Sequence, residues 1–146
     1  MPEPTFIDWA QLAAYIDGEG CIIISRAKPN SRQRNPQYQL VVSVYNTDPR
    51  LAVWLKERFG GFIYVSKPKG NRKPRYTWQV TSLRAEEILR GCYSYFILKR
   101  EQAEVGLQFR ALKVYRRWSA TPPTMVLQRE TLKQKLHQLH AQEVVQ

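Results

Sequence analysis

Two stretches of the chain alternate between apolar and polar residues with a period of two. This is the spacing of side chains on one face of a β-strand, so residues 37–46 and 75–81 are predicted to be strands with one buried face. The opposite faces carry mainly amides, hydroxyls and one arginine. The apolar positions that share a face are Tyr38, Leu40, Val42 and Val44 in the first stretch and Tyr76, Trp78 and Val80 in the second.

Two further strands are indicated by β-branched and aromatic runs, at 21–28 and at 62–66. Three consecutive isoleucines at 22–24 hide the alternation in the first run, so the pattern does not assign Ser25 or Arg26 to a face. Polar turns at 29–36 and 67–73 join each strand to the alternating strand that follows it. The pattern therefore predicts two hairpins.

Helices are predicted between and after these hairpins. Asp8 is placed to cap a first helix that ends near residue 17, with Leu12, Tyr15 and Ile16 facing the core. Asp48, Pro49 and the glycines at 60–61 delimit a second helix over 49–59. The remaining predicted helices run from a Ser82 cap to about Arg90, over 92–118, and over 124–142. This order predicts an α+β fold, a four-stranded antiparallel sheet with helices on one face.

Length and composition fit one domain, with a core at about 5–118 and a helical tail at 122–146. The hydrophobic content of 43% is typical of a globular chain, and two cysteines give no disulfide framework. No apolar run is long enough to cross a membrane, and the acidic N-terminus lacks the apolar core of a secretory signal. We therefore expect an intracellular protein, cytoplasmic or organellar, with no membrane partner.

The charge balance points to a polyanion, because the net charge is +11 and both predicted hairpins carry basic residues without an acid. Amides and arginines on a strand face can also pair with base edges in the major groove of double-stranded DNA. The predicted DNA-binding residues are Ser25, Arg26, Lys28, Arg32, Arg34, Gln37, Gln39, Ser43, Tyr64, Ser66, Lys67, Lys69, Arg72, Lys73, Arg75, Thr77 and Gln79. Gln37, Gln39, Ser43, Arg75, Thr77 and Gln79 are the candidate base readers among them.

Residues 12–20, Leu-Ala-Ala-Tyr-Ile-Asp-Gly-Glu-Gly, place two carboxylates at the end of the first helix. Ala10, Ala14 and Gly18 recur every four residues upstream, which lets another helix approach closely. Asp-Gly and Glu-Gly pairs are also ordinary turn chemistry. The combination of a small-residue stripe, two acids and a basic chain favours a metal site at an interface.

This stretch resembles the signature of the LAGLIDADG homing endonucleases. It matches the signature at Leu12, Ala13, Ile16, Asp17 and Gly20, and it departs at Ala14, Tyr15, Gly18 and Glu19. The resemblance covers about residues 5–115 and implies the αββαββα fold of that family. It also implies a site-specific, metal-dependent DNA endonuclease. The implied cofactor is Mg²⁺, with Mn²⁺ able to substitute, held by the Glu19 carboxylate and the Gly18 carbonyl.

The resemblance implies three further catalytic positions. Asn46 stands at the end of the second strand, near the expected scissile phosphate and its water. Arg50 lies just inside the next helix, and Lys99 lies in the segment Phe96–Ala103. For Arg50 and Lys99 an ordinary helix-surface charge is an equal alternative.

A double-strand break needs two acids, and the chain holds one motif, so a C2 homodimer on a roughly palindromic target is predicted. The predicted dimer contact consists of Ala10, Ala13, Ala14, Asp17 and Gly18. Two other functions remain open at this stage. One is a catalytically silent DNA-binding regulator on the same fold, and the other is an RNA maturase that binds its host intron RNA.

Overall fold

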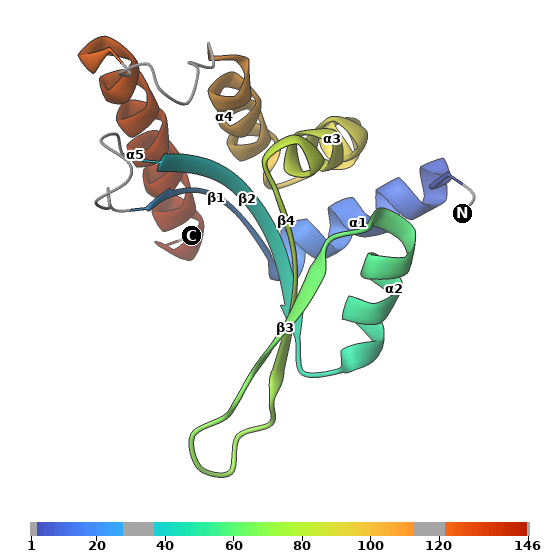
Figure 1. The fold of residues 1–146 in the computed structure, drawn as a ribbon. Coiled ribbons are helices and arrows are strands. Elements are labelled where there is room, and N and C mark those ends of the chain that lie inside the picture. Colours follow the sequence, from blue (N-terminus) through green and yellow to red (C-terminus); the bar gives the residue numbers. More distant parts are fainter. Residues whose placement is uncertain (1–2, 28–36, 113–121, 146) are drawn as a thin grey trace.

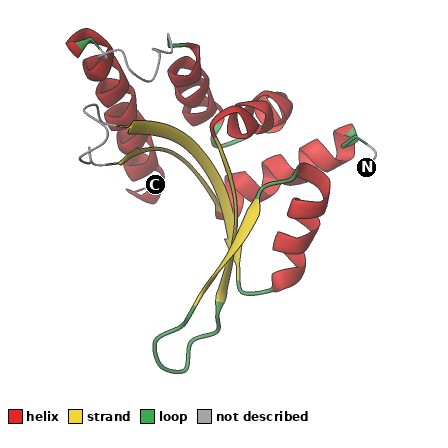
Figure 2. Cartoon of the chain, in the orientation of Figure 1, coloured by secondary structure: helices red, strands yellow, loops and turns green. Residues whose placement is uncertain are grey.

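The protein folds into one four-stranded antiparallel sheet with helices packed on one side of it (Figures 1 and 2). The computed structural model describes residues 3–27, 37–112 and 122–145. The sheet order is β1-β2-β4-β3, and the predicted α+β class and antiparallel hairpins are confirmed. The elements in chain order are α1 (Phe6–Glu19), β1 (Gly20–Ala27), β2 (Gln37–Asn46), α2 (Pro49–Phe59), β3 (Phe62–Ser66), β4 (Arg75–Thr81), α3 (Ser82–Cys92), the 3₁₀ turn η1 (Tyr93–Tyr95), α4 (Arg100–Ala111) and α5 (Pro123–Val145).

The core lies between the sheet and helices α1 to α4, which cover its convex side (Figure 1). Trp78 of β4 is fully buried there and packs edge-on against Phe59 of α2, with ring centroids 6.5 Å apart. Its indole N–H donates to the carbonyl of Gly60 at 2.7 Å, so the buried ring leaves no unsatisfied donor. The predicted second helix and its Gly60 end are confirmed, with Gly60 at φ 74°.

Two predicted helix starts are wrong. Thr5, not Asp8, caps α1: the Thr5 hydroxyl accepts from the Asp8 backbone N–H, and the Asp8 carboxylate accepts from the Thr5 N–H, which forms a reciprocal capping box. Helix α3 has Thr81 rather than Ser82 at its N-cap position, without a side-chain cap.

Tyr15 was expected in the core but is 40% exposed, because only Leu12, Ala13 and Ile16 turn inward from that part of α1.

The long helix expected over 92–118 is also wrong. The chain forms α3 and η1, runs without regular structure over 96–99, and resumes a helix only at Arg100. The physical reason is the Asp17 carboxylate, which accepts hydrogen bonds from backbone N–H groups of this segment and so starts α4 anew. Residues 113–118 of the prediction fall outside the described residues.

Helix α5 covers the outer edge of the sheet. It packs against α4 and β1, and it buries Leu136 among the isoleucines of β1. The Tyr38 hydroxyl on β2 donates to Glu130 of α5 at 2.6 Å. Burial first, and then this hydrogen bond, raise the pKa of Tyr38 to about 12. The tail helix predicted over 124–142 is confirmed, and it protects the edge strand β1 from pairing with another chain.

The concave side of the sheet is not covered by α1 to α4, and we call it the open face (Figure 1). Strand register assigns its members, because residues two apart and their cross-strand partners share a face. The open face consists of Cys21, Ile23 and Ser25 of β1, Gln37, Gln39, Val41, Ser43 and Tyr45 of β2, Phe62, Tyr64 and Ser66 of β3, and Arg75, Thr77, Gln79 and Thr81 of β4.

None of the helices in the described residues combines the length and the apolar character that a membrane span requires.

Candidate active site and nucleic-acid interface

Glu19, the last residue of α1, meets Asn46, the last residue of β2. The Asn46 side-chain amide donates to the Glu19 carboxylate with Nδ2 and Oε2 2.9 Å apart. Glu19 is exposed, and Asn46 is half-buried. Because β1 and β2 pair antiparallel from Gly20 and Val44, the end of the motif helix and the end of β2 lie side by side. Two of the predicted catalytic residues are therefore in direct contact.

Arg50 is linked to the same pair through the start of α2. The Asn46 side-chain oxygen accepts from the Asp48 backbone N–H at 2.9 Å, and Asp48 caps α2 by accepting from the Arg50 backbone N–H. The Arg50 guanidinium also binds the Asp48 carboxylate, with the closest atoms 2.6 Å apart. These hydrogen bonds lower the pKa of Asp48 to about 2, so its charge persists through neutral pH. The Arg50 side chain is 89% exposed, while its Nε and Nη2 atoms are bound to Asp48.

The backbone of Lys99 is linked to the motif helix through Asp17. The Asp17 carboxylate accepts from the backbone N–H groups of Ile97 at 2.8 Å, Leu98 at 3.3 Å and Lys99 at 3.0 Å. Lys99 itself is 4% exposed, so it is a buried residue at the start of α4 and not a helix-surface charge. Asp17 thus ties this lysine to the last turn of the helix that ends in Glu19.

The small-residue stripe is only partly available for a contact with another chain. Ala14 and Gly18 are exposed and Ala10 is half-buried, but Ala13 is 0% exposed within this chain. The assignment of Ala13 to the dimer contact is therefore wrong, because its side chain lies in the core. A Cβ atom at Gly18 would meet no described atom within 4 Å apart from its own helix turn and chain neighbours, so no contact among the described residues requires a glycine there.

The donor set near Glu19 consists of oxygen ligands, which suits Mg²⁺ more than a soft metal. Within the described residues, no group of three or more His, Cys, Asp or Glu side chains is placed to hold a metal ion. One chain therefore offers a single exposed carboxylate at the predicted metal position. Such a donor set fits an ion whose remaining ligands come from water, phosphate oxygens or a second copy of the chain.

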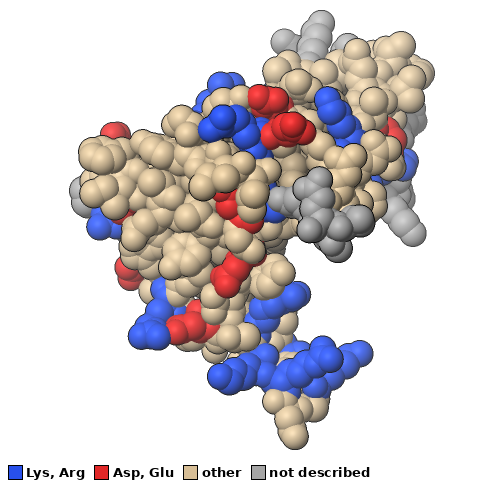
Figure 3. Space-filling view, turned by 180° about the vertical axis from the view of Figure 1, so that it is seen from behind, with Lys and Arg blue, Asp and Glu red and all other residues tan. Residues whose placement is uncertain are grey.

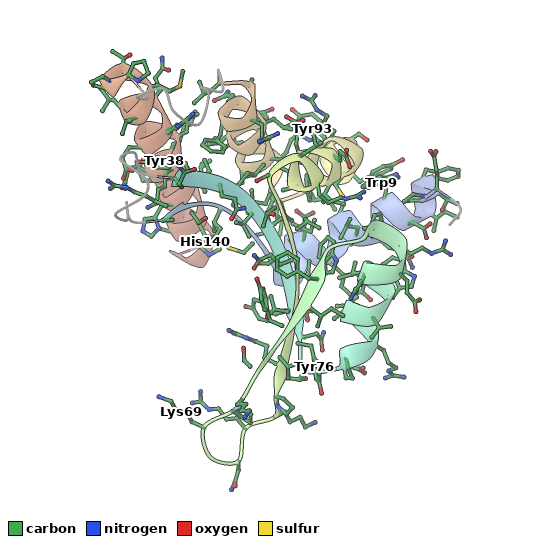
Figure 4. All side chains as sticks on the ribbon, in the orientation of Figure 1. Trp9, Tyr38, Lys69, Tyr76, Tyr93 and His140 are labelled. Atoms are coloured by element: carbon green, nitrogen blue, oxygen red, sulfur yellow. The ribbon has the colours of Figure 1, made fainter. Side chains whose placement is uncertain are left out.

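Basic side chains gather on the β3–β4 hairpin, which extends beyond the body of the molecule (Figures 3 and 4). They are the predicted DNA-binding residues Lys67, Lys69, Arg72, Lys73 and Arg75, and all five are exposed. The Arg75 guanidinium lies over the Tyr45 ring, 4.7 Å from its centroid. Arg75 therefore belongs to the open face next to the end of β2 that carries Asn46.

The other predicted DNA-binding residues separate into three groups. Ser25, Gln37, Gln39, Ser43, Tyr64, Ser66, Thr77 and Gln79 share the open face with Arg75. Arg26 instead pairs with Tyr38 on the helix-covered face and lies over its ring at 5.8 Å, so it does not share the open face with the candidate base readers. Lys28, Arg32 and Arg34 lie outside the described residues.

Sequence reasoning missed two features of this region. The open face was expected to be polar and basic, but it also exposes Ile23 and Phe62. The spacing of Phe62 from Tyr64 and Ser66, both predicted DNA-binding residues, was the available signal for Phe62, which the structure places opposite Gln79. The contact of Asp17 with the segment before α4 joins residues about eighty positions apart, and no local pattern reports it.

Comparison with protein-family models gave no match, and no curated protein matches the sequence. Solved structures do match the fold. The homing endonuclease I-CvuI in complex with the I-CreI target is 20% identical, with 91% of this chain and 82% of that chain covered and a TM-score of 0.73. The I-SmaMI LAGLIDADG homing endonuclease bound to cleaved DNA is 19% identical, with 91% and 45% covered and a TM-score of 0.64.

A third similar structure is the archaeal intron-encoded homing endonuclease I-Vdi141I complexed with DNA. It is 12% identical, with 92% of this chain and 98% of that chain covered and a TM-score of 0.54. At these identities the likeness establishes the fold. The chain therefore has the fold of the LAGLIDADG homing endonucleases, as its motif predicts.

Proposed function

We propose that this chain, which has the fold of the LAGLIDADG homing endonucleases, is a site-specific DNA endonuclease that uses a divalent metal ion. The observation that carries the proposal is the contact of Glu19 with Asn46 at the end of the motif helix. That helix end lies beside the end of β2, which pairs with the start of β4, where β4 leaves the basic hairpin. An acid beside a polyanion-binding surface is unfavourable for binding alone, because its charge repels phosphates. A metal ion at Glu19 would remove that repulsion.

Glu19 and the Gly18 carbonyl would hold the ion, Mg²⁺ or Mn²⁺. When bound, such an ion stabilises the negative charge that develops as a phosphodiester is hydrolysed. Asn46 holds the Glu19 carboxylate in place through the 2.9 Å hydrogen bond. The exposed Arg50 guanidinium would stabilise charge on the phosphate. Lys99, whose backbone is bound to Asp17 and whose side chain is buried, would add positive charge from within the protein.

The active assembly would be a homodimer formed through α1. Each chain offers one acid at the helix end, and cutting two strands requires two. Ala14 and Gly18 present an exposed surface of little side-chain volume, on which a second helix could pack closely. Ile97 and Leu98, which are 87% and 63% exposed, stand beside Asp17 and would extend this contact with apolar area. The target should then be roughly palindromic.

The basic hairpin and the open face would contact double-stranded DNA. The cations of the hairpin can neutralise phosphates, and the amides of the open face can pair with base edges. The six candidate base readers would each contact a different position in a half-site, so a long target is expected.

Selection of cleaved duplexes from a randomised DNA library in Mg²⁺ tests the proposal. We expect a single family of cut sites with two-fold symmetry, and no cleavage when the metal is chelated. Selective binding without cleavage in Mg²⁺ or Mn²⁺ would make the chain a silent DNA-binding protein. Cleavage of sites without any shared sequence would contradict the site specificity.

The assembly has a separate test. Sedimentation of the protein free and on its selected duplex should give two chains in the DNA complex. A single chain on a symmetric duplex would contradict the dimer, and cleavage of only one strand would then be expected.

A further inference from the structure

Four large apolar or aromatic side chains are exposed on the open face. Their exposed fractions lie between 39% and 48%, on a face where amides and cations were expected. Single exposed apolar residues need no explanation, but a group on one binding face indicates a ligand with apolar surface. The four residues are Ile23, Tyr45, Phe62 and Tyr64.

Phe62 and Tyr64 form a fixed pair on β3. They are two positions apart on one face, and their rings meet edge to face with centroids 5.0 Å apart. Phe62 lies opposite Gln79 of β4, and Tyr64 lies opposite Thr77. Each aromatic ring therefore has a polar neighbour on the adjacent strand, at cross-strand contact distance.

The chemistry of the Phe62 ring limits what it can recognise. It has no hydrogen-bond donor or acceptor, so it cannot read the polar pattern of a base edge. The apolar group that a base pair presents in the major groove is the C5-methyl of thymine. The side-chain amide of Gln79 can pair with N6 and N7 of adenine. Phe62 and Gln79 together match the two halves of one A·T pair.

We propose that Phe62 and Tyr64 read thymine C5-methyl groups, so that target recognition depends on these methyl groups beside the adenine contact of Gln79. The proposal deepens the proposed function and rests on it. A partner with this chemistry is DNA and not an apolar protein surface, because the same hairpin carries five exposed cations. Residues two apart on a strand are about 6.8 Å apart, so Phe62 and Tyr64 would contact positions roughly two base pairs apart.

The experiment replaces thymine by deoxyuridine, one position at a time, in the duplex selected above. This change removes only the methyl group and keeps every hydrogen-bonding atom. We expect wild-type binding, measured in Ca²⁺, to weaken roughly fourfold at one or two positions in each half-site. In the Phe62→Ala protein, the effect at one of these positions should vanish, because the methyl group has lost its contact.

Leu83→Ala is the matched control, since Leu83 is an exposed apolar residue on α3, away from the open face. It should retain the full effect of deoxyuridine. The wild-type measurement needs no variant, so the proposal can fail even if Phe62→Ala does not fold. Indifference of wild-type protein to every deoxyuridine would overturn the proposal while leaving the endonuclease intact. So would an effect that persists in both Phe62→Ala and Tyr64→Ala. A protein that selects no DNA at all would overturn the proposed function itself.

Discussion

The carboxylate of Asp17 accepts a hydrogen bond from the backbone N–H of Lys99, with Oδ1 and the nitrogen 3.0 Å apart. The same carboxylate accepts from the two preceding residues, Ile97 and Leu98. The first acid of the motif thus holds the three residues that lead into α4, a helix whose own N-cap residue, Lys99, makes no side-chain cap. It fixes where α4 begins and therefore where Lys99 lies relative to the motif helix.

Replacing Asp17 tests this role. Asp17→Ala should lower the free energy of unfolding by about 1–2 kcal/mol, because three backbone N–H groups lose their acceptor. Asp17→Asn keeps one acceptor oxygen and should lose less. If the Asp17 contact positions Lys99, both variants should also lower kcat on the selected duplex while KM changes little, and Asp17→Asn should lower kcat less than Asp17→Ala. Thermal unfolding and steady-state cleavage measure the two effects. Loss of stability with unchanged kcat would show that the Asp17 contact has a structural role only.

The contact of Asp17 with the segment before α4 is also the part of the fold that the sequence does not predict. The four strands and the helix over 49–59 could be predicted, because their periodicity, caps and glycines are local. The segment Phe96–Lys99 contains no proline or glycine and has helical propensity, so a continuous helix was the natural prediction. Its interruption depends on a carboxylate that only the folded chain brings there.

The candidate site likewise combines residues that the sequence predicts with contacts that form only in the folded chain. The resemblance predicts Glu19 and Asn46 as site residues, while their direct contact follows only from strand pairing. Exposed Phe62 could not be separated from a core residue by its type, since β3 is an edge strand with both faces partly in solvent.

Gly18 and Gly20 provide a matched pair of substitutions. A Cβ at Gly20 would lie 2.6 Å from the Ile16 Cα and 3.0 Å from the Ser43 carbonyl oxygen, both backbone atoms. Gly20→Ala should therefore destabilise the monomer fold by about 1–3 kcal/mol. Gly18→Ala would bring its Cβ against no other described element, so it should not destabilise the fold. If α1 forms the dimer contact, Gly18→Ala should instead weaken self-association, as measured by sedimentation. Unchanged association would remove Gly18 from the contact.

Arg75 tests the nucleic-acid face. Because it lies over Tyr45 among the open-face residues, it should contact a base edge and not only a phosphate. Arg75→Ala should cost about 1–3 kcal/mol of binding free energy and relax the preference at one position in each half-site. Lys69→Ala, at the tip of the same hairpin (Figure 4), is the comparison. It should weaken binding to all sequences alike and reduce the salt dependence. Uniform weakening by both changes would make Arg75 a phosphate contact.

Tyr38 gives a pH dependence with a defined sign. Its pKa is raised from 10.0 to about 12 by burial and by its bond to Glu130, so the fold favours the neutral phenol. The stability that this contributes should be fully present below pH 10.0 and should be lost as the pH rises towards about 12. Tyr38→Phe should abolish that part of the alkaline loss. The difference between the tyrosinate absorbance titrations of the wild-type and Tyr38→Phe proteins measures the pKa of Tyr38 directly. A value near 10 would contradict the contact between Tyr38 and α5.

Glu19→Gln is the decisive substitution for catalysis. The amide keeps the shape of the side chain but is a much weaker Mg²⁺ ligand than a carboxylate, so cleavage should fall on the order of a hundredfold or more. DNA affinity should persist or rise, because a negative charge that faces phosphates is gone. Glu57→Gln, an exposed acid on α2, is the control and should leave cleavage unchanged. The measurements are cleavage in Mg²⁺ and binding in Ca²⁺, with the thermal midpoint as a check on folding. Cleavage near the wild-type rate would refute Glu19 as the metal ligand, and a large fall in the thermal midpoint would assign Glu19 a structural role at the helix end.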